Sequence, residues 1–362
     1  MTVNRYSTRL ISCILGSVLL LSACGPQEAE NHTAPTAEPS AVPTSVNSPL
    51  PSATTAPSVT SALSGLTGLP VTESMLPRPL AVMINNAPAA RPQSGVSEAD
   101  ILYEVLAEGG ITRLIGIFQS HTGVVKIGPI RSIRPYLIDL GESYGAVTVH
   151  AGGSQAAYAI LQQQKKEDMD EIGNAGSYFW RDKTRKAPHN LYSNAAKLWE
   201  GADKLGYSDN PGVPNYLFNN PDYMPLGGEP VSEFSVHFML QSYKVEYKYD
   251  KERRTYQRWV NDKPHLDLNN NNPVEAANVI VMGADHKVLD DVGRLSVDVE
   301  LGGDALLFQR GQMIKGRWMR EPDDVIRFVK DGEEVLLYPG TTHFLIVPNS
   351  PTFESHVTYV QQ

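Results

Sequence analysis

Short apolar runs separated by polar turns dominate the chain from residue 79 onward and predict β-strands. The short apolar run at 79–84 predicts a buried strand. Residues 101–106, apolar at 101, 102, 105 and 106, and residues 111–118 are two further predicted strands. Gly109-Gly110, between the second run and the third, predicts a tight connection. Another buried strand is predicted at 146–150.

Three segments have the composition of helices. Residues 135–144 begin with a proline, which is favoured in a first helical turn, and residues 154–164 are rich in Ala, Gln and Leu. The segment 193–205 has Ser193 as its predicted N-cap and Gly206 just beyond its end. Strands and helices mix without strict alternation, so this part predicts a mixed α/β domain.

The last third of the chain is mostly strand-like. Residues 242–249 alternate in polarity, and Asp331-Gly332 is a strong hairpin signal. Further strands are predicted at 278–282, 295–301, 305–308, 325–329, 335–338 and 342–347. A proline-rich connection at 207–232 precedes this part. The predicted class is therefore α+β, with a mixed α/β domain followed by a smaller, mainly antiparallel β domain.

The first 23 residues have the form of a secretory signal peptide. Arg5 and Arg9 make a basic start, and an apolar stretch follows at 10–21. The segment ends in Leu-Ser-Ala-Cys at 21–24, which fits a lipobox whose Cys24 thiol is diacylglycerylated. Acyl chains such as palmitate on Cys24 predict a protein held on the extracytoplasmic face of the cell membrane. The alternative is a plain signal anchor, for which the apolar stretch is short.

Residues 24–65 predict a disordered tether behind the lipidated cysteine. Of the 38 residues from 25 to 62, 26 are Ala, Pro, Ser or Thr, and none is Lys, Arg or aromatic. Such a segment cannot bury enough apolar surface to offset the entropy of ordering. The predicted organisation is a signal peptide at 1–23, the tether at 24–65, and domains at 66–228 and 229–362.

Composition argues against several classes of protein. The 362 residues include 31 Lys+Arg and 40 Asp+Glu, and a net charge of −9 argues against a general nucleic-acid binder. The two cysteines, Cys13 and Cys24, both lie near the N-terminus, so thiol catalysis and thiolate metal sites are excluded from the body. The nine histidines have no paired short spacing. We therefore predict neither a metal site nor a cofactor.

Three segments of the first predicted domain concentrate chemistry. The first carries Arg131, Ser132 and Arg134 just before the helix predicted at 135–144. The N–H groups at a helix start and two guanidinium groups together suit an anion. The alternative is that both arginines form structural ion pairs with Asp100, Glu104 or Glu108. Those acids, with Glu98, are also candidates for acid/base groups.

The second segment runs from His150 through Gly152 and Gly153 to Ser154, where a strand ends and a helix begins. This layout presents N–H groups at the carboxyl end of a strand, a common ligand position. It matches neither the dinucleotide fingerprint nor the nucleophile elbow. Two interpretations of Ser154 remain open: a nucleophile with His150 or His189 as its base, or a helix cap.

The third segment, 179–190, crowds aromatic, basic and amide side chains into a predicted loop. Trp180 is suited to stacking on a sugar or another ring, and Arg181, Arg185, His189 and Asn190 are suited to holding an anion. The alternative is a solvated basic turn.

These stretches, taken in order, resemble the YerB-type lipoproteins of Gram-positive bacteria. The resemblance covers nearly all of the chain after the tether and rests on residues 79–86, 91–95, 97–100, 109–113, 127–134, 150–154, 179–190, 278–281, 293–294, 315–318 and 338–340. It implies two domains of unknown function on a membrane-anchored extracytoplasmic lipoprotein, and it implies no reaction. The chain departs from the family at Ile133, where a small residue is more common.

The leading hypothesis is a binding lipoprotein of the cell envelope, and whether the protein is an enzyme stays open. The expected ligand is an anionic envelope component, such as a peptidoglycan fragment or a phosphate-bearing polymer, and the three segments must converge to hold it. The first alternative is an envelope hydrolase or transferase that uses His150 or His189 as base and Ser154 or water as nucleophile. The second is a scaffold that binds an envelope protein partner.

Overall fold

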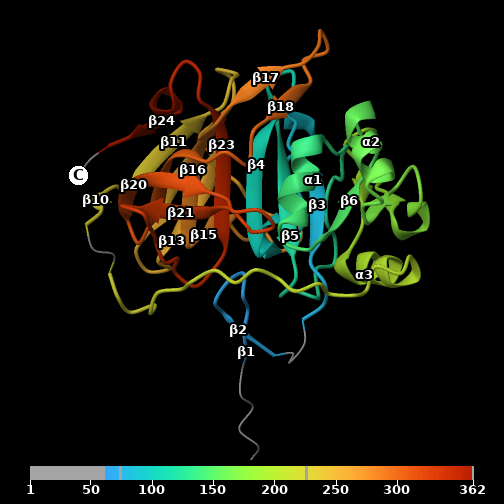
Figure 1. The fold of residues 1–362 in the computed structure, drawn as a ribbon, viewed down its shortest axis with the longest axis horizontal. Helices are drawn as coiled ribbons and strands as arrows, with labels where there is room; N and C mark the ends of the chain where they lie inside the picture. The colour runs from blue at the N-terminus through green and yellow to red at the C-terminus, as the bar shows by residue number, and fades with distance from the viewer. Residues whose placement is uncertain (1–61, 73–75, 225–226, 361–362) are drawn as a thin grey trace, which may run out of the picture. The chain divides into compact units, whose positions relative to one another are not determined.

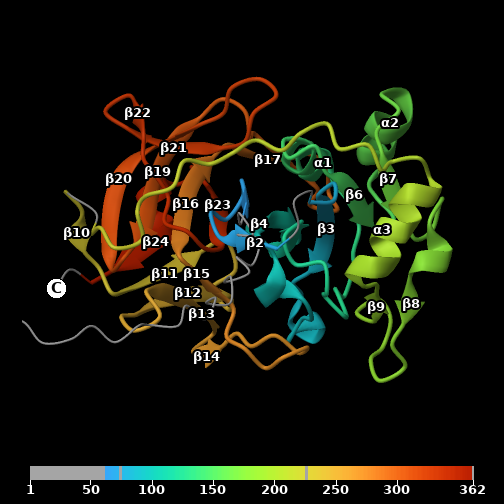
Figure 2. The same ribbon diagram turned by 90° about the horizontal axis from the view of Figure 1, so that it is seen from below.

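The computed structural model describes residues 62–72, 76–224 and 227–360. The predicted signal peptide, Cys24 and nearly all of the predicted tether lie outside these residues. The described strands belong to one large mixed sheet, one six-stranded sheet and three small two-stranded pairs (Figures 1 and 2). None of the described helices is long and apolar enough to cross a membrane.

The part up to residue 204 contains the described α-helices. Its strands are β1 (Ala62–Leu63), β2 (Pro70–Val71), β3 (Leu80–Asn85), β4 (Ile101–Glu108), β5 (Ile111–Phe118), β6 (Val147–His150), β7 (Asp168–Asp170), β8 (Trp180–Arg181) and β9 (Leu191–Tyr192). Its helices are α1 (Pro135–Glu142), α2 (Gln155–Gln163) and α3 (Ala195–Lys204). The strands predicted at 79–84, 101–106, 111–118 and 146–150 are confirmed as β3, β4, β5 and β6.

The remainder of the described chain contains strands and one short 3-10 helix. The strands are β10 (Glu229–Pro230), β11 (Glu233–His237), β12 (Lys244–Asp250), β13 (Thr255–Val260), β14 (Lys263–Pro264), β15 (Glu275–Ala276), β16 (Asn278–Ala284), β17 (His286–Val288), β18 (Leu295–Val297), β19 (Gly303–Gln309), β20 (Gln312–Met319), β21 (Arg327–Lys330), β22 (Glu333–Glu334), β23 (Thr342–Pro348) and β24 (Val357–Tyr359).

The large sheet runs continuously from the N-terminal to the C-terminal part of the described chain. Its order is β22-β21-β20-β19-β16-β23-β4-β5-β3-β6-β7, with β10 beside β20. Strand β23 lies between β16 and β4 and is parallel to both. The division at 228/229 stays a prediction, and the two segments that it separates contribute strands to one sheet.

Strand β3 shows why the first apolar run is continuous. Its residues Ala81 and Met83 belong to one hydrophobic core, whereas Leu80, Val82 and Ile84 belong to the core on the other face. Side chains alternate across a strand, so a strand covered on both faces needs apolar residues at every position. Helices α1 and α2 pack against the first core, and α3 packs against the second.

The predicted helix starts are right at α1 and α2 and wrong at α3. Pro135 is the first residue of α1, and the Ser154 side chain caps α2 by accepting a hydrogen bond from the Ala157 N–H. The cap of α3 is Asn194, which accepts from the Lys197 N–H. Ser193 instead donates its hydroxyl hydrogen to the Tyr178 carbonyl, and its side chain does not cap the helix.

The C-terminal strands confirm most of the expected pattern. Alternation at 242–249 corresponds to β12, and the turn at Asp331-Gly332 joins β21 to β22 with positive φ at both residues. The strand predicted at 295–301 ends at Val297 as β18. The strand predicted at 335–338 is wrong, because beyond β22 this segment makes only an isolated bridge between Leu337 and Phe218.

The two main sheets pack face to face over aromatic side chains. Phe234 of β11 and Phe308 of β19 stack with their ring centroids 3.6 Å apart, and both rings belong to the larger core. Aromatic pairs of this kind add to the free energy gained by burying apolar area. The six-stranded sheet, of order β14-β13-β12-β11-β24 with β15 beside β13, is therefore fixed against the large one.

Candidate functional site

The first two predicted segments lie side by side. The Ile133 N–H donates to the Gly152 carbonyl at 3.0 Å, and the Ala151 N–H donates to the Arg131 carbonyl at 3.1 Å. The Ser132 hydroxyl also donates to the Ala151 carbonyl at 3.1 Å. These bonds join the chain before α1 to the turn before α2, so the two segments share one edge of the sheet.

The third segment adjoins the first. The Ile130 N–H donates to the Leu191 carbonyl at 2.7 Å, just after the loop at 180–190. At the end of that loop, the His189 ring lies 2.9 Å from the amide nitrogen of Asn85, the last residue of β3. The structure therefore brings all three segments together around the end of β3, although their roles differ.

Arg131 is the member of the first segment that stays unpaired. Glu108 accepts hydrogen bonds from Arg113 at 3.2 Å and from Arg134 at 2.7 Å, so one carboxylate serves two guanidinium groups. Burial lowers the pKa of Arg113 to about 10, Glu108 opposes this, and the positive charges of Arg134 and Arg131 reinforce it. Half-buried Arg131 makes no side-chain hydrogen bond or ion pair with any described residue.

His189 faces this excess positive charge as a neutral ring. The Asn85 side-chain oxygen accepts from the Ala87 N–H at 3.0 Å, so its amide nitrogen is the atom that donates to His189 Nδ1. The ring proton is then on Nε2. Burial lowers the pKa of His189, and the charges of Arg131 and Arg185 lower it further. Near neutral pH, His189 can therefore offer one N–H donor beside Arg131.

The second segment is held by internal bonds. His150 is fully buried, with Nε2 at 3.2 Å from an Asp168 carboxylate oxygen and Nδ1 at 3.0 Å from the Gly152 carbonyl. The Gly152 N–H donates to Asp170 at 2.8 Å. Both ring nitrogens of His150 are thus engaged, and Ser154 acts as a cap. The geometry supports the cap interpretation of Ser154 and gives it no hydrogen-bonded base.

Most polar side chains of the third segment form hydrogen bonds that fix the conformation of the loop that carries them. Arg181 bonds Glu171 and Asn190, and the Asn190 amide donates to the carbonyls of Asp182 and Arg185. Arg185 donates to the Ala90 and Pro92 carbonyls at 2.7 Å each, which ties the loop to the chain after β3. Trp180 is half-buried, and Gly153 lies against Ile133.

The acidic residues of β4, and Asp100 just before it, pair differently from one another. Glu108 does pair with Arg134, as the structural alternative supposed, but Glu104 bonds Arg258 from the six-stranded sheet. Asp100 accepts from the backbone N–H groups of Gln119 and Ser120. These carboxylates are therefore engaged in holding the fold.

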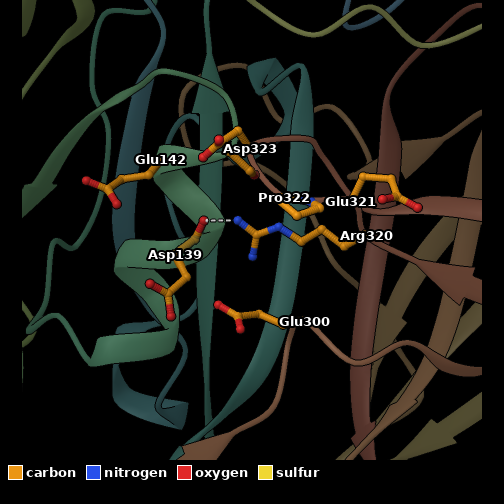
Figure 3. A pocket seen from close by; sticks show the side chains of 8 residues that line it. Asp139, Glu142, Glu300, Arg320, Glu321, Pro322 and Asp323 are labelled. Atoms are coloured by element: carbon orange, nitrogen blue, oxygen red, sulfur yellow. Dashed lines mark hydrogen bonds between the residues drawn. The ribbon is translucent and has the colours of Figure 1, made fainter.

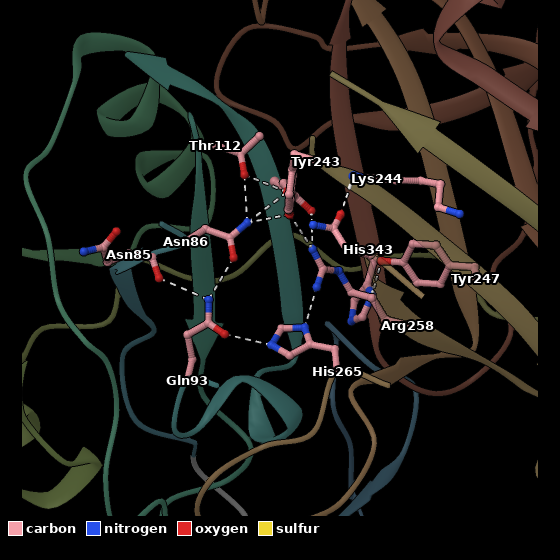
Figure 4. Close-up of polar contacts among 12 residues, drawn as sticks. Asn85, Asn86, Gln93, Thr112, Tyr243, Lys244, Tyr247, Arg258, His265 and His343 are labelled. Carbon is pink, nitrogen blue, oxygen red and sulfur yellow. Dashed lines mark hydrogen bonds and ion pairs between the residues drawn. The ribbon is translucent and has the colours of Figure 1, made fainter. Parts of the chain in front are cut away.

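A buried polar network surrounds Glu104. Figure 4 shows the side chains of Asn86, Thr112, Tyr243 and Arg258 in this network pointing toward one another. One Glu104 oxygen accepts from Asn86, Thr112 and Tyr243, and the other accepts from Arg258 at 2.7 Å. The network continues to His265, which hydrogen-bonds both Arg258 and Gln93. A buried network whose members have partners fixes the elements that carry them. Here those elements belong to both main sheets.

A second polar feature is an acidic pocket of about 440 Å³ beside α1 (Figure 3). Its carboxylates belong to Asp139, Glu142, Glu300, Glu321 and Asp323. Arg320 donates to backbone carbonyls there, including that of Asp139 at 3.0 Å. Burial raises the pKa of Asp139 to about 6, although Arg320 opposes that rise. Within the described ranges, no three His, Cys, Asp or Glu side chains are arranged to hold a metal ion.

The sequence reasoning missed Asn85, Asn86 and Arg91. The asparagines were treated only as the end of a strand, although two amide side chains at the carboxyl end of a buried strand are themselves a signal for a polar site. Arg91 lies six residues after Asn85 and outside the three segments. Its Nη1 atom has no hydrogen-bond partner among the described residues. Nothing in its spacing distinguished it from a loop residue.

Both parts of the described chain match one family of proteins of unknown function. The family model described as "Protein of unknown function (DUF3048) N-terminal domain" matches residues 66–208, and the one described as "Protein of unknown function (DUF3048) C-terminal domain" matches residues 234–344. The chain belongs to this family.

Two relatives support that assignment. Over 285 residues, 78% of this chain and 86% of the relative, the chain is 36% identical to the "Putative lipoprotein YerB" of Bacillus subtilis strain 168. The crystal structure of the YerB protein from Bacillus subtilis is similar with a TM-score of 0.75 and 34% identity, covering 83% of this chain and all of that one. The chain is thus a homologue of a protein named as a lipoprotein, and the resemblance to YerB-type proteins is confirmed.

Proposed function

We propose that this protein is a lipid-anchored, extracytoplasmic binding protein of the cell envelope. Its described part binds an anionic group of an envelope polymer at Arg131 and His189. The lipobox at 21–24 and the name of the relative support the anchor. The tether at 24–65 would then separate the binding surface from the membrane.

The observation that carries the binding proposal is the unpaired charge of Arg131. Arg113 and Arg134 share Glu108, and Arg185 is bonded to carbonyls, whereas Arg131 has no partner in the described chain. A half-buried guanidinium group beside other cations loses hydration without gaining a counter-charge. An anion at Arg131 and the His189 Nε2–H group would supply that charge through charge-assisted hydrogen bonds.

A phosphate-bearing polymer and a peptidoglycan fragment are the two ligand types to compare. The full chain, purified in a nonionic detergent, is titrated by calorimetry with a glycerol-phosphate oligomer, a soluble muropeptide and inorganic phosphate. We expect saturable binding of one polymer that weakens at least tenfold in Arg131→Gln and also weakens with added salt. Arg131 has no bond to lose, so this variant should stay folded.

The matched control is Arg317→Gln, which removes the same charge from an exposed ion pair with Asp304. It should leave binding unchanged. Equal weakening by both substitutions would reduce the effect to net charge and contradict a site at Arg131. Absence of binding with all three probes would reject anion binding and leave a protein partner as the alternative.

The anchor is tested separately. Cells that express the chain are labelled with radioactive palmitate and fractionated, and Cys24→Ala is compared with the natural chain. We expect label and membrane association in the natural chain and loss of both in the variant. Unlabelled but membrane-bound protein in both cases would overturn lipidation at Cys24.

A further inference from the structure

Arg91 is a second arginine without a counter-charge in the described part of the chain. Its Nη1 atom is buried and has no hydrogen-bond partner, and no described residue forms an ion pair with its guanidinium group. The other described arginines, apart from Arg131, hydrogen-bond or pair with acidic or carbonyl groups. A partly buried guanidinium group without a counter-charge loses hydration that nothing in the described chain replaces, so it points to a partner outside the chain.

Tyr243 holds the Arg91 guanidinium group in place. The central carbon of the group lies 5.0 Å from the centroid of the Tyr243 ring, a cation–π contact. The ring is itself fixed, because its hydroxyl donates to Glu104 and accepts from Asn86 and Arg258 (Figure 4). A guanidinium group that is held by contact with the face of an aromatic ring keeps N–H donors available for a ligand. In an ion pair, those donors would already be used.

A small cavity of about 50 Å³ adjoins Arg91. One water needs roughly 10–15 Å³ of such space, so this cavity admits a group of about three or four heavy atoms. Its polar lining comes from Asn86, Thr112, Ser242 and Tyr243, and its apolar lining includes Ile111 and Leu240. Arg91 is the one charged residue in that lining.

We propose that this cavity binds a carboxylate group that carries a short apolar substituent. The planar carboxylate would accept two parallel hydrogen bonds from the Nε–H and Nη2–H groups of Arg91, and the substituent would lie against Ile111 and Leu240, each 37% exposed. A single negative charge fits better than a phosphate dianion, because the acidic side chain of Glu104 lies at the far end of the Tyr243 ring. Either a peptide C-terminus or a free short-chain acid has this chemistry.

The proposal is separate from anion binding at Arg131. Arg131 does not line the cavity, and Arg91 faces Tyr243 whereas Arg131 lies beside His189. Either binding proposal can therefore be wrong without affecting the other.

The test uses the full chain in detergent and nuclear magnetic resonance of its arginine Nε–H groups. The probes are N-acetyl-alanyl-alanine, the same peptide with a C-terminal amide, and butyrate. We expect a saturable shift of the Arg91 resonance with an acid and none with the amide. Peptide acid binding more tightly than butyrate identifies a peptide C-terminus, and the reverse order identifies a free acid.

Substitutions complete the test. Arg91→Gln breaks no hydrogen bond or ion pair, so the protein should stay folded, and binding of the acid should weaken at least tenfold. Arg91→Lys keeps the charge but loses the two-point geometry and should bind with intermediate affinity. Arg317→Gln, which removes the same charge from an exposed ion pair with Asp304, is the matched control and should bind normally. Equal shifts with acid and amide, or unchanged binding in Arg91→Gln, would overturn the proposal.

Discussion

Glu104 and Arg258 are 154 residues apart in the chain and form an ion pair of 2.7 Å with side chains only 3% and 1% exposed. Glu104 belongs to β4 of the large sheet, and Arg258 belongs to β13 of the six-stranded sheet. Burial alone lowers the pKa of Arg258, but Glu104, Tyr243 and Tyr247 together more than reverse this effect. Arg258 therefore stays charged, and its ion pair with Glu104 connects the two sheets.

Breaking this pair should destabilise the whole described unit. Glu104→Gln leaves a buried, uncompensated guanidinium group on Arg258 and also weakens the acceptor for Asn86, Thr112 and Tyr243. We expect the free energy of unfolding to fall by about 3–5 kcal/mol, measured by urea denaturation at pH 7. The control is Asp304→Asn, which breaks the exposed pair with Arg317 and should change little. Similar losses in the two variants would contradict the role assigned to burial.

Stability should fall as the pH is lowered below about 6.5, because of buried neutral histidines. Burial first, and then the charge of Arg258, lower the pKa of His343 to about 3. Below pH 6.5 the unfolded chain binds a proton on this residue that the folded chain does not, so unfolding becomes more favourable.

His343→Asn should reduce that acid sensitivity. Asparagine keeps a polar atom near the position of Nδ1, which bonds the Tyr247 hydroxyl at 2.9 Å, but it does not titrate. Between pH 7 and pH 5 the variant should lose roughly 2 kcal/mol less stability than the natural chain. His265, whose pKa burial also lowers, keeps part of the slope. Parallel stability curves for the two chains would show that His343 does not titrate as inferred.

Asp139 should act in the opposite direction. Its pKa is raised to about 6, mainly by burial, so above pH 6 the folded state carries a charge that the unfolded state hydrates better. Asp139→Asn should stabilise the protein at pH 7 by roughly 1–3 kcal/mol and lose this advantage below about pH 4. Asp323→Asn, on the same pocket (Figure 3), is the control and should stabilise less. An equal gain in both would indicate general charge repulsion.

Ser154 should behave as a helix cap. Ser154→Ala removes the acceptor for the Ala157 N–H at 3.2 Å and should cost about 1 kcal/mol in thermal or urea unfolding. Ser154→Asp has no hydroxyl but retains a capping oxygen, so its stability should be close to that of the natural chain. If Ser154→Asp were as unstable as Ser154→Ala, the cap interpretation would be wrong.

Local patterns were enough to predict the central strands and helices. Strand β5 begins and ends at the predicted residues, and α1 begins at its predicted proline, because a two-sided core and a helix start impose residue types within a few positions. Short-range rules failed where two signals compete. Ser193 and Asn194 are both favourable N-cap residues. In the structure the cap of α3 is Asn194, two residues after the end of β9.

The candidate site was predicted only in part. The sequence located three chemistry-rich segments, and the structure brings them together through backbone bonds such as that from Ile130 to Leu191. The sequence could not indicate that Arg134 has a carboxylate partner while Arg131 has none among the described residues. That difference depends on the path of β4, which carries Glu108. The pairing of Glu104 with Arg258 likewise had no signal at any local spacing.

The sequence by itself determined the core strands and the mixture of α and β elements, and it predicted a lipobox and an anionic ligand, because each depends on residues close together in the chain. Only the tertiary structure decided that β23 joins both parts of the chain in one sheet, and that Arg91 and Arg131 have no counter-charge among the described residues. The physical reason is that a charge is neutralised by whatever lies within a few ångströms in space. For a guanidinium group in this fold, that neighbour can be 154 residues away.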